Sequence, residues 1–262
     1  MKATNIDVTL MVTLQKLTQY TNTFLQIDCF NDYCPNGLQV EGSDSIQRIV
    51  TGVTASQALL EDACDKNADA VLVHHGYFWK NEDPRVIGMK RARLNTLLVN
   101  NISLLAYHLP LDAHPEVGNN VQLAQFLGIQ VEDELSTNSQ PACGSVGYFK
   151  KAMDAVEVKQ LIESKLNHSC IHVDVGSTPI TTVAWCTGAG QGFIDIAAGK
   201  KLDAYISGEI SEQTTHIARE AGIHYFAAGH HATERYGIQA LGEHLAGEFD
   251  LVHSFVDIDN PA

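Results

Sequence analysis

The sequence has 262 residues, of which 31 are acidic and 17 are basic, giving a formal net charge of −14. A chain of this length can form one large domain or two smaller ones, and it needs neither disulfides nor a structural metal to fold. Because binding to a nucleic-acid polymer requires a row of cations, the acidic balance argues against DNA or RNA as a partner. A hydrophobic content of 45% with 18% charged residues is typical of a soluble globular protein.

The cysteines indicate a reducing compartment. The six of them form no CxxC pair and show no spacing typical of a zinc ribbon or a disulfide framework. We therefore expect buried, reduced thiols in a cytoplasmic protein. The first residues lack a charged segment followed by an apolar one, and no apolar run approaches the ~18 residues of a membrane span. The sequence thus predicts neither secretion nor a membrane partner.

The first half of the chain alternates between strand and helix patterns. The predicted elements are a helix at 10–26, a strand at 46–54, a helix from Ser56, a strand at 71–75, a helix at 89–100 and a strand at 102–107. A strand–helix–strand order of this kind predicts a parallel sheet. The turn-rich residues 29–42 are interpreted as a loop. Asp32 within them is interpreted as the carboxylate of an Asx-turn, with a ligand role as the alternative.

The second half begins with a polar stretch at 129–142, which is interpreted as a domain boundary. The predicted elements after it are strands at 144–150, 170–175, 180–186, 203–209 and 223–227 and helices at 155–166 and 232–245. The motif GAGQG at 188–192 lies between a strand and a helix, where it could cradle phosphate. It lacks the spacing of a nucleotide-binding loop, which favours a tight packing turn. Ser207 and Glu209 are candidates for supporting or substrate contacts.

Two adjacent histidines, His74 and His75, follow the apolar run at 71–73. Neighbouring residues on a strand point to opposite faces, so the pair can serve one site only if the backbone turns there, as Gly76 allows. Neutral imidazole is a ligand for zinc, iron, nickel and manganese. The alternative is a pair of surface or hydrogen-bonded core histidines.

The segment that follows the next predicted strand is HLPLDAHPEVGNN at 108–120. It holds His108, Asp112 and His114, and its two prolines exclude a regular helix through the whole stretch. Because parallel strands end at the same edge of a sheet, we expect this segment near the histidine pair. Asp112 is the best oxygen ligand here, and its alternative role is to cap the next helix.

A third group lies in the segment GHHATERYG at 229–237. His230 and Glu234 are four residues apart at the start of a predicted helix, so their side chains lie on the same side of its first turn. A glutamate that bridges two metal ions, with the histidine on one of them, is one interpretation. The alternative is a capping arrangement in which the helix dipole favours Glu234 and the histidines are solvated.

Histidine, aspartate or glutamate residues follow three of the predicted strands. One shared metal site explains this better than three coincidences. Two divalent ions need roughly eight or more donor atoms, so three histidines and two carboxylates leave positions open for water. Open positions are typical of catalytic sites. A water shared by two metal ions becomes a nucleophile near neutral pH.

Long stretches of the sequence resemble a known family. These are DYCPNGLQVEG at 32–42, VLVHHG at 71–76, YHLPLDAHPEVGNN at 107–120, YISGEISEQT at 205–214 and GHHATERYGIQALGEHL at 229–245. They are similar to the GTP cyclohydrolase 1 type 2 homologues, also called the NGG1-interacting-factor-3-like (NIF3-like) family. The resemblance covers nearly the whole chain.

The resemblance implies two interlinked α/β domains with mixed sheets flanked by helices, a toroidal homohexamer and a dinuclear metal centre that faces its cavity. Matched by motif, the ligands are His74, His75, Asp112, His230 and Glu234. We place the first domain at 1–128 plus 222–262, with most of the ligands, and the second at 129–221.

Function is predicted at the level of a reaction class. The sequence favours a hydrolase with two divalent ions per chain that acts on a nucleotide or another phosphorylated small molecule, and the family name suggests opening of the GTP purine ring. The alternatives are a non-catalytic metal-binding or interaction protein and a metal-handling ring. Zinc, iron, manganese and nickel all suit such ligands. His108, His114 and His231 are candidate general acids or bases, with supporting or solvated roles as the alternative.

Overall fold

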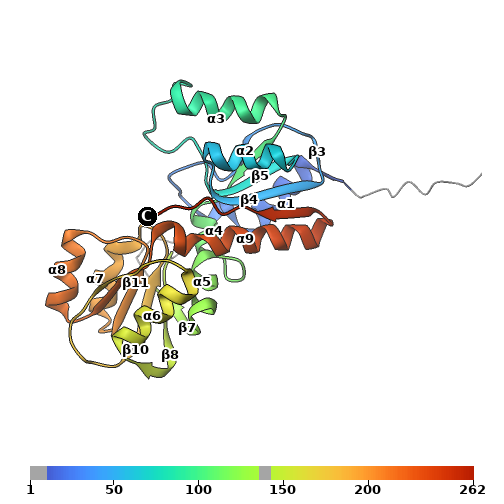
Figure 1. The fold of residues 1–262 in the computed structure, drawn as a ribbon. Helices are drawn as coiled ribbons and strands as arrows, with labels where there is room; N and C mark the ends of the chain where they lie inside the picture. The colour runs from blue at the N-terminus through green and yellow to red at the C-terminus, as the bar shows by residue number, and fades with distance from the viewer. Residues whose placement is uncertain (1–10, 136–142) are drawn as a thin grey trace, which may run out of the picture. The chain divides into compact units, whose positions relative to one another are not determined.

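The computed structural model describes residues 11–135 and 143–262, and within these ranges the chain forms two α/β units (Figure 1). Unit 1 comprises Met1–Ile27, Tyr33–Tyr107 and Leu241–Val256, and unit 2 comprises Asp28–Asp32, His108–Ala240 and Asp257–Ala262. Because the chain passes between the units several times, neither is one continuous segment. The predicted class, α/β with mixed sheets flanked by helices, is confirmed.

The boundaries of these units differ from the predicted domains. The prediction placed 1–128 plus 222–262 in the first domain, whereas residues 108–128 and 222–240 belong to unit 2. The physical reason is packing: Leu123 and Leu127 lie in the core of unit 2, and the strand that contains Phe226 is hydrogen-bonded within its sheet. Residues 1–10 and 136–142, where the first predicted helix begins and the predicted boundary ends, lie outside the described residues.

Unit 1 is built on a parallel sheet. Its elements are β1 (Val12–Thr13), α1 (Leu14–Phe24), β2 (Gly37–Val40), β3 (Ser45–Ile46), β4 (Arg48–Thr54), α2 (Gln57–Asp65), β5 (Ala70–His75), α3 (Gly88–Val99), β6 (Ser103–Ala106), β13 (Val252–Phe255) and the end of α9 (His230–Phe249). Among the described residues the strand order is β13-β4-β5-β6-β2, and only β2 is antiparallel to its neighbour. The short strands β1 and β3 pair with each other.

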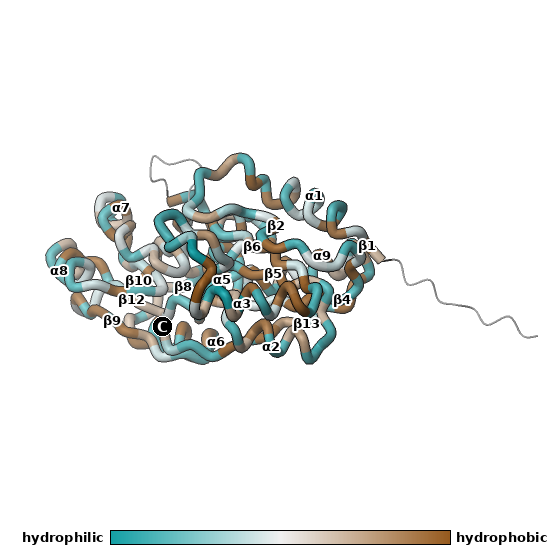
Figure 2. Tube along the Cα trace, turned by 90° about the horizontal axis from the view of Figure 1, so that it is seen from above, coloured by the Kyte–Doolittle hydropathy of each residue, from teal (hydrophilic) through white to brown (hydrophobic). Residues whose placement is uncertain are grey.

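The strand β2 corrects one prediction, because it lies within the segment interpreted as a loop. The backbone hydrogen bonds of β2 are made with β6, which lies far along the chain. The few apolar residues of β2 do not by themselves indicate a strand. The predicted unit β4–α2–β5 is confirmed as parallel, with Val50 opposite Val71. Ser56 caps α2, since its side chain accepts a hydrogen bond from the backbone N–H of Leu59 at 3.3 Å. Figure 2 shows β5 as a hydrophobic run, as expected for a buried strand.

Helices cover both faces of this sheet. A Cβ at Gly52 of β4 would meet the Leu59 side chain of α2 at 2.7 Å, so α2 packs closely on one face. A Cβ at Gly242 of α9 would meet the neighbouring Thr51 at 2.7 Å, which places the end of α9 on the opposite face. On that side Tyr20 of α1 hydrogen-bonds to His244 of α9 at 2.8 Å. Unit 1 is therefore a three-layer α/β/α structure.

Unit 2 has a mixed sheet. Its elements are α4 (Leu109–Ala113), α5 (Asn119–Leu127), β7 (Ile129–Glu134), β8 (Ser145–Met153), α6 (Ala155–Leu166), β9 (Ile171–Val173), β10 (Ile180–Cys186), η2 (Gly190–Phe193), α7 (Ile194–Gly199), β11 (Ala204–Ser207), α8 (Glu212–Ala221), β12 (His224–Ala227) and the start of α9. A short 3-10 helix, η1 (Ile27–Cys29), lies at the first crossing between the units.

In the described part of the chain, the strand order of unit 2 is β7-β8-β10-β11-β12-β9. The central strands β10, β11 and β12 are parallel, and the outer ones are antiparallel. The strand β7 corrects a second prediction: residues 129–134 were interpreted as part of a domain boundary. An edge strand can carry the exposed residues Glu132 and Asp133 because one of its sides is not paired.

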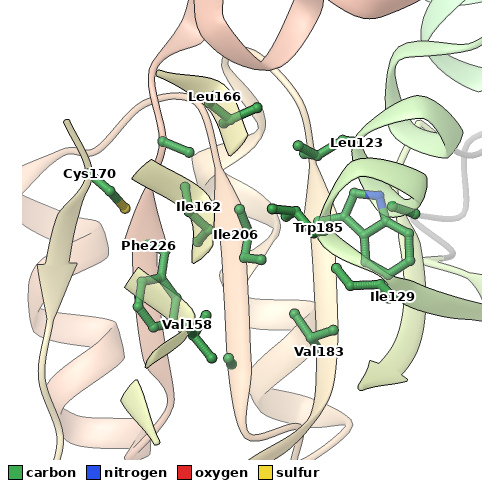
Figure 3. Close-up of a cluster of buried hydrophobic side chains, with 14 of the residues drawn as sticks. Leu123, Ile129, Val158, Ile162, Leu166, Cys170, Val183, Trp185, Ile206 and Phe226 are labelled. Carbon is green, nitrogen blue, oxygen red and sulfur yellow. The ribbon is translucent and has the colours of Figure 1, made fainter. Parts of the chain in front are cut away.

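The core of unit 2 lies on both faces of its sheet. On one face α5 and α6 pack over Trp185, Ile206 and Phe226, and α7 and α8 cover the other face. Figure 3 shows Trp185 and Ile129 on one side of the first cluster and Phe226 and Cys170 on the other. The buried indole N–H of Trp185 donates to the Asn120 carbonyl at 2.9 Å. Within the two described ranges, no helix is long and apolar enough to cross a membrane.

Candidate metal centre

The histidine pair of unit 1 lies at the carboxyl end of β5. His74 is completely buried, and its Nδ1 lies 2.9 Å from the backbone carbonyl of Tyr107. A carbonyl oxygen only accepts hydrogen bonds, so Nδ1 of His74 carries the proton and Nε2 carries the ring lone pair. Ligand histidines in metal sites are oriented in this way, with the second ring N–H donated to a carbonyl or a carboxylate.

His75 lies beside His74 and not on the opposite face of the sheet. The two ring centroids are 4.5 Å apart, and Nδ1 of His75 lies 3.3 Å from the Thr54 hydroxyl on β4. A Cβ at Gly76 would lie 2.3 Å from the side-chain oxygen of Gln39, so only glycine allows this close approach after the pair. The two imidazoles can therefore serve one site within unit 1.

In unit 2, His230 and Glu234 face each other across the first turn of α9. Nε2 of His230 lies 3.2 Å from Oε2 of Glu234, and its Nδ1 lies 2.7 Å from Oε1 of Glu209. Burial by itself would lower the pKa of His230, but the hydrogen bonds and charges of Glu234 and Glu209 raise it to about 9. A cation is therefore favoured at the position between His230 and Glu234.

Asp112 brings a second carboxylate to this part of unit 2. Its ligand oxygen lies within 4.8 Å of that of Glu234, and the two residues are only 8% and 3% exposed. Its Oδ1 accepts hydrogen bonds from the Asn119 amide at 2.8 Å and the Thr187 hydroxyl at 3.3 Å. Two buried carboxylates repel each other unless a cation compensates them. The donor set of unit 2 thus fits a divalent ion.

The GAGQG motif packs against two of these candidate ligands, Glu234 and His230. Gly188 has a φ of +60°, and a Cβ there would lie 2.0 Å from Oε1 of Glu234. Its N–H donates to the Thr233 hydroxyl at 3.0 Å, and its carbonyl accepts from the N–H of Gly208 at 2.9 Å. This is the packing turn that the sequence favoured, and its contacts explain why position 188 requires glycine.

The remaining histidines have different partners. His108 lies 2.7 Å from the Asp32 carboxylate, which also accepts the backbone N–H of Leu109 at 2.9 Å. Asp32 thus has partners in a distant part of the chain, which the Asx-turn interpretation did not predict. Nδ1 of His114 accepts two backbone N–H groups of its own turn at 3.3 Å, which fits a local structural role. His231 hydrogen-bonds to Asp257 at 2.8 Å.

Some residues around the candidate ligands could not be recognised from the sequence. Asn119 and Thr187 hold Asp112, yet each is a single polar residue without a motif of its own. Glu209 was noted as a supporting residue, and its contact with His230 agrees with that role. The pairing of Asp32 with His108 joins residues 76 positions apart, a separation that no local pattern reports.

In this α/β fold, histidine and carboxylate side chains lie at the ends of strands and at the start of a helix. This arrangement defines a class of candidate metal-binding proteins. The described residues contain several groups of histidine, aspartate and glutamate side chains that could hold a metal ion. The model of the family Duf34/NIF3 (NGG1p interacting factor 3) matches residues 12–261, and the chain belongs to this family.

Relatives confirm the resemblance seen in the sequence motifs. A protein from Pseudomonas aeruginosa named GTP cyclohydrolase 1 type 2 homolog is 53% identical over 251 residues, which cover 96% of this chain and 99% of the relative. A solved structure described as protein ybgI, of unknown function, has a TM-score of 0.92 and 52% identity and covers 96% of this chain and all of its own. The structure of TTHA1606 from Thermus thermophilus covers the same shares, with a TM-score of 0.87 and 31% identity.

Proposed function

We propose that this chain is a metal-dependent hydrolase with two divalent ions per chain, acting on a nucleotide or another phosphorylated small molecule. The proposed ligands are His74, His75, Asp112, His230 and Glu234. Divalent ions held there would polarise an electrophile and lower the pKa of a coordinated water. Zinc, iron, manganese and nickel all suit this mixture of imidazole and carboxylate.

The observation that carries the proposal is the orientation of two histidines. Each has Nδ1 held by a group that can only accept a hydrogen bond, the Tyr107 carbonyl for His74 and the Glu209 carboxylate for His230. In both, Nε2 is therefore the nitrogen suited to a metal ion, and in His230 the ion would take the place of the proton shared with Glu234. Two histidines oriented for the core alone would not be expected to share this pattern.

The carboxylates of unit 2 support the same proposal. Asp112 and Glu234 are buried within 4.8 Å of each other, and hydrogen bonds to Asn119 and Thr187 hold Asp112 in place. Burial of two negative charges so close together is costly without cations. A divalent ion would remove this cost, and it would also replace the proton that His230 otherwise keeps.

His108 is the proposed general acid or base. Its Nδ1 lies 2.7 Å from Asp32, whose side chain is only 3% exposed. A buried carboxylate that orients an imidazole is a recurrent catalytic arrangement. The sequence also offered His114 and His231. Nδ1 of His114 accepts backbone N–H groups of its own turn, and Asp257, the partner of His231, is 39% exposed and also pairs with Arg235. The proton-transfer role is therefore assigned to His108.

The substrate class rests on the relatives. Proteins more than half identical to this chain bear the name GTP cyclohydrolase 1 type 2 homolog, which makes GTP the first substrate to test. We also propose a homohexamer, as the family resemblance implies. Hydrolysis of GTP would add water either at the purine ring or at a phosphoanhydride bond of the triphosphate.

The test is turnover of GTP by metal-loaded protein. Ring opening is followed by the loss of purine absorbance. Cleavage within the triphosphate is followed by the release of phosphate or pyrophosphate, and assembly by light scattering. We expect metal-dependent turnover in the wild type, a large loss in Glu234→Gln and Asp32→Asn, and no loss in Glu212→Gln, a matched change at an exposed residue of α8. Metal-loaded, assembled protein that hydrolyses neither GTP nor other phosphorylated nucleosides would contradict the proposal and favour a non-catalytic metal-binding role.

A further inference from the structure

A second cluster of metal-ligating side chains lies at the edge of the unit 2 sheet, where β9 pairs with β12. His172 lies opposite Phe226 in this antiparallel pair, and their rings stack with centroids 4.5 Å apart. Asp174 is two residues beyond His172, and His224 is two residues before Phe226. Because strand side chains alternate between faces, all of these groups lie on the same face of the sheet.

The distances within the cluster match a coordination sphere. Nε2 of His172 lies 3.1 Å from Nδ1 of His224, and Oδ1 of Asp174 lies 3.8 Å from the same Nδ1. The three ligand atoms lie within 4.8 Å of one another. Two nitrogens bound at 2.0–2.1 Å to a tetrahedral zinc ion are roughly 3.3 Å apart, so the two imidazole nitrogens already have about the separation that one ion requires.

The surroundings hold the imidazoles in place and leave the carboxylate adjustable. His224 is 1% exposed, and His172 is fixed by stacking on Phe226. The Asp174 side chain is 70% exposed, so it can rotate and bring its oxygen the few tenths of an ångström closer that coordination requires. Burial, with a further contribution from His224, lowers the pKa of His172.

We infer that His172, Asp174 and His224 form a zinc site, separate from the proposed dinuclear centre because the two share no residue. Two imidazoles and one carboxylate are zinc ligands, and three protein ligands leave a position for water. A site with one open position at an exposed edge takes up and releases its ion more readily than a closed structural site.

The metal-free arrangement sets a limit on how tightly zinc binds. Nε2 of His224 is buried and has no hydrogen-bond partner among the described residues. Without metal, a proton shared between Nδ1 of His224 and Nε2 of His172 joins the two rings. Zinc bound to these nitrogens displaces that proton, and a proton on Nε2 of His224 then meets no acceptor among the described residues. The site is thus an exchangeable zinc site and does not hold the fold together.

The test is zinc stoichiometry by equilibrium dialysis and plasma mass spectrometry on the full chain. We compare the wild type with His172→Asn and Asp174→Asn, and with His216→Asn as a matched control at an exposed histidine of α8. The wild type and the control should bind one zinc ion more than His172→Asn, and Asp174→Asn should bind this ion at least about tenfold more weakly. The visible absorption of bound Co²⁺ reports the same site independently.

Removing the dinuclear ligands separates the two sites. In a chain carrying His75→Asn and Glu234→Gln, one zinc ion should remain and should disappear when His172→Asn is added. Circular dichroism establishes that each variant is folded. If His172→Asn does not fold, Asp174→Asn replaces it in this test, because Asp174 is exposed and its substitution should not disturb the fold. Equal zinc content in folded wild type and Asp174→Asn across a titration would overturn the inference.

Discussion

Glu209 and His230 form a short contact in unit 2, with Oε1 of Glu209 2.7 Å from Nδ1 of His230. Glu209 follows β11 and His230 begins α9, so the contact joins two elements and fixes the imidazole ring between them. The carboxylate sets the tautomer, which leaves Nε2 of His230 facing Glu234 at 3.2 Å. Its role is therefore to position a proposed ligand.

We predict that Glu209→Ala lowers metal affinity by about 10–100-fold, the usual effect of removing a group that orients a ligand histidine. Glu209→Gln should have a smaller effect, because its amide oxygen can still accept the N–H of His230. Calorimetric titration with Zn²⁺ measures both. The control is Glu212→Ala on the exposed side of α8, and equal affinity in Glu209→Ala and this control would show that the contact does not support metal binding.

The turn at Gly188 predicts a steric effect. In Gly188→Ala the new Cβ would lie 2.0 Å from Oε1 of Glu234, in a backbone with a φ of +60°. We expect a loss of about 1–3 kcal/mol in the free energy of unfolding and weaker metal binding, because Glu234 must move. Urea denaturation measures the loss. Gly199→Ala in α7, where a Cβ meets nothing within 4 Å, should be nearly neutral, and a similar loss in both variants would contradict the prediction.

Asp203 predicts a stability effect away from the metal ligands. Its Oδ2 accepts hydrogen bonds from the backbone N–H groups of Thr181 and Thr182 at 2.9 and 2.8 Å and from the Thr182 hydroxyl at 2.8 Å. These bonds tie β10 to the start of β11. Asp203→Ala should cost about 1–3 kcal/mol in urea denaturation near neutral pH, whereas Glu220→Ala at an exposed position should cost little.

The same carboxylate gives the prediction a pH dependence. Burial raises the pKa of Asp203, but the hydrogen bonds from Thr182 and Thr181 outweigh it and hold the pKa below its ordinary value of 3.8. The folded state therefore releases the proton more readily than the unfolded state, and the stabilisation is fully present above the ordinary value. It is lost as the pH falls through the folded value, so the difference between wild type and Asp203→Ala should shrink in acid. A difference that is constant with pH would exclude this explanation.

His253 predicts a loss of stability on mild acidification. Its Nε2 lies 2.8 Å from the Thr51 hydroxyl, and burial lowers its pKa below the ordinary value of 6.5 despite the opposing charge of Glu243. The unfolded chain binds a proton at His253 more readily than the folded chain, so stability falls as the pH decreases through 6.5 toward the folded value. Urea denaturation between about pH 7.5 and pH 5.5 measures this loss.

In His253→Gln the pH dependence should be weaker, because the titrating group is gone while a side chain that can bond to Thr51 remains. The control is His216→Gln, which removes an exposed histidine and should leave the pH dependence as in the wild type. Identical pH profiles for the two variants would show that burial of His253 does not control this transition.

Local patterns predicted most of the fold correctly. Helical spacing found α6 at residues 155–166, and the order of strand, helix and strand found the parallel pair of β4 and β5. The strands β2 and β7 were missed because each depends on a partner strand for its hydrogen bonds, whereas its own residues are those of turns or of a polar segment. The predicted domain boundaries differ from those of the two units because α5 packs in a core whose other residues come later in the sequence.

For the candidate site, the sequence indicated the candidate ligands and the structure shows which side chains contact them. The spacing of His230 and Glu234 predicted their contact, since both lie on one side of a helical turn. The partners Asp32, Asn119 and Thr187 could not be found in this way, because they meet the site residues through tertiary packing. A local sequence pattern can predict which side chains share one face of a helix or strand. It cannot predict which residues from elsewhere in the chain contact that face.

The most direct test of the proposed dinuclear centre is the metal content per chain, measured by plasma mass spectrometry. His172→Asn is the background, so that the proposed zinc site does not contribute. We predict about two divalent ions in this chain and a loss of both when His75→Asn and Glu234→Gln are added, with circular dichroism and assembly unchanged. A chain that takes up no added metal, or the same metal content with and without these ligands, would contradict the account.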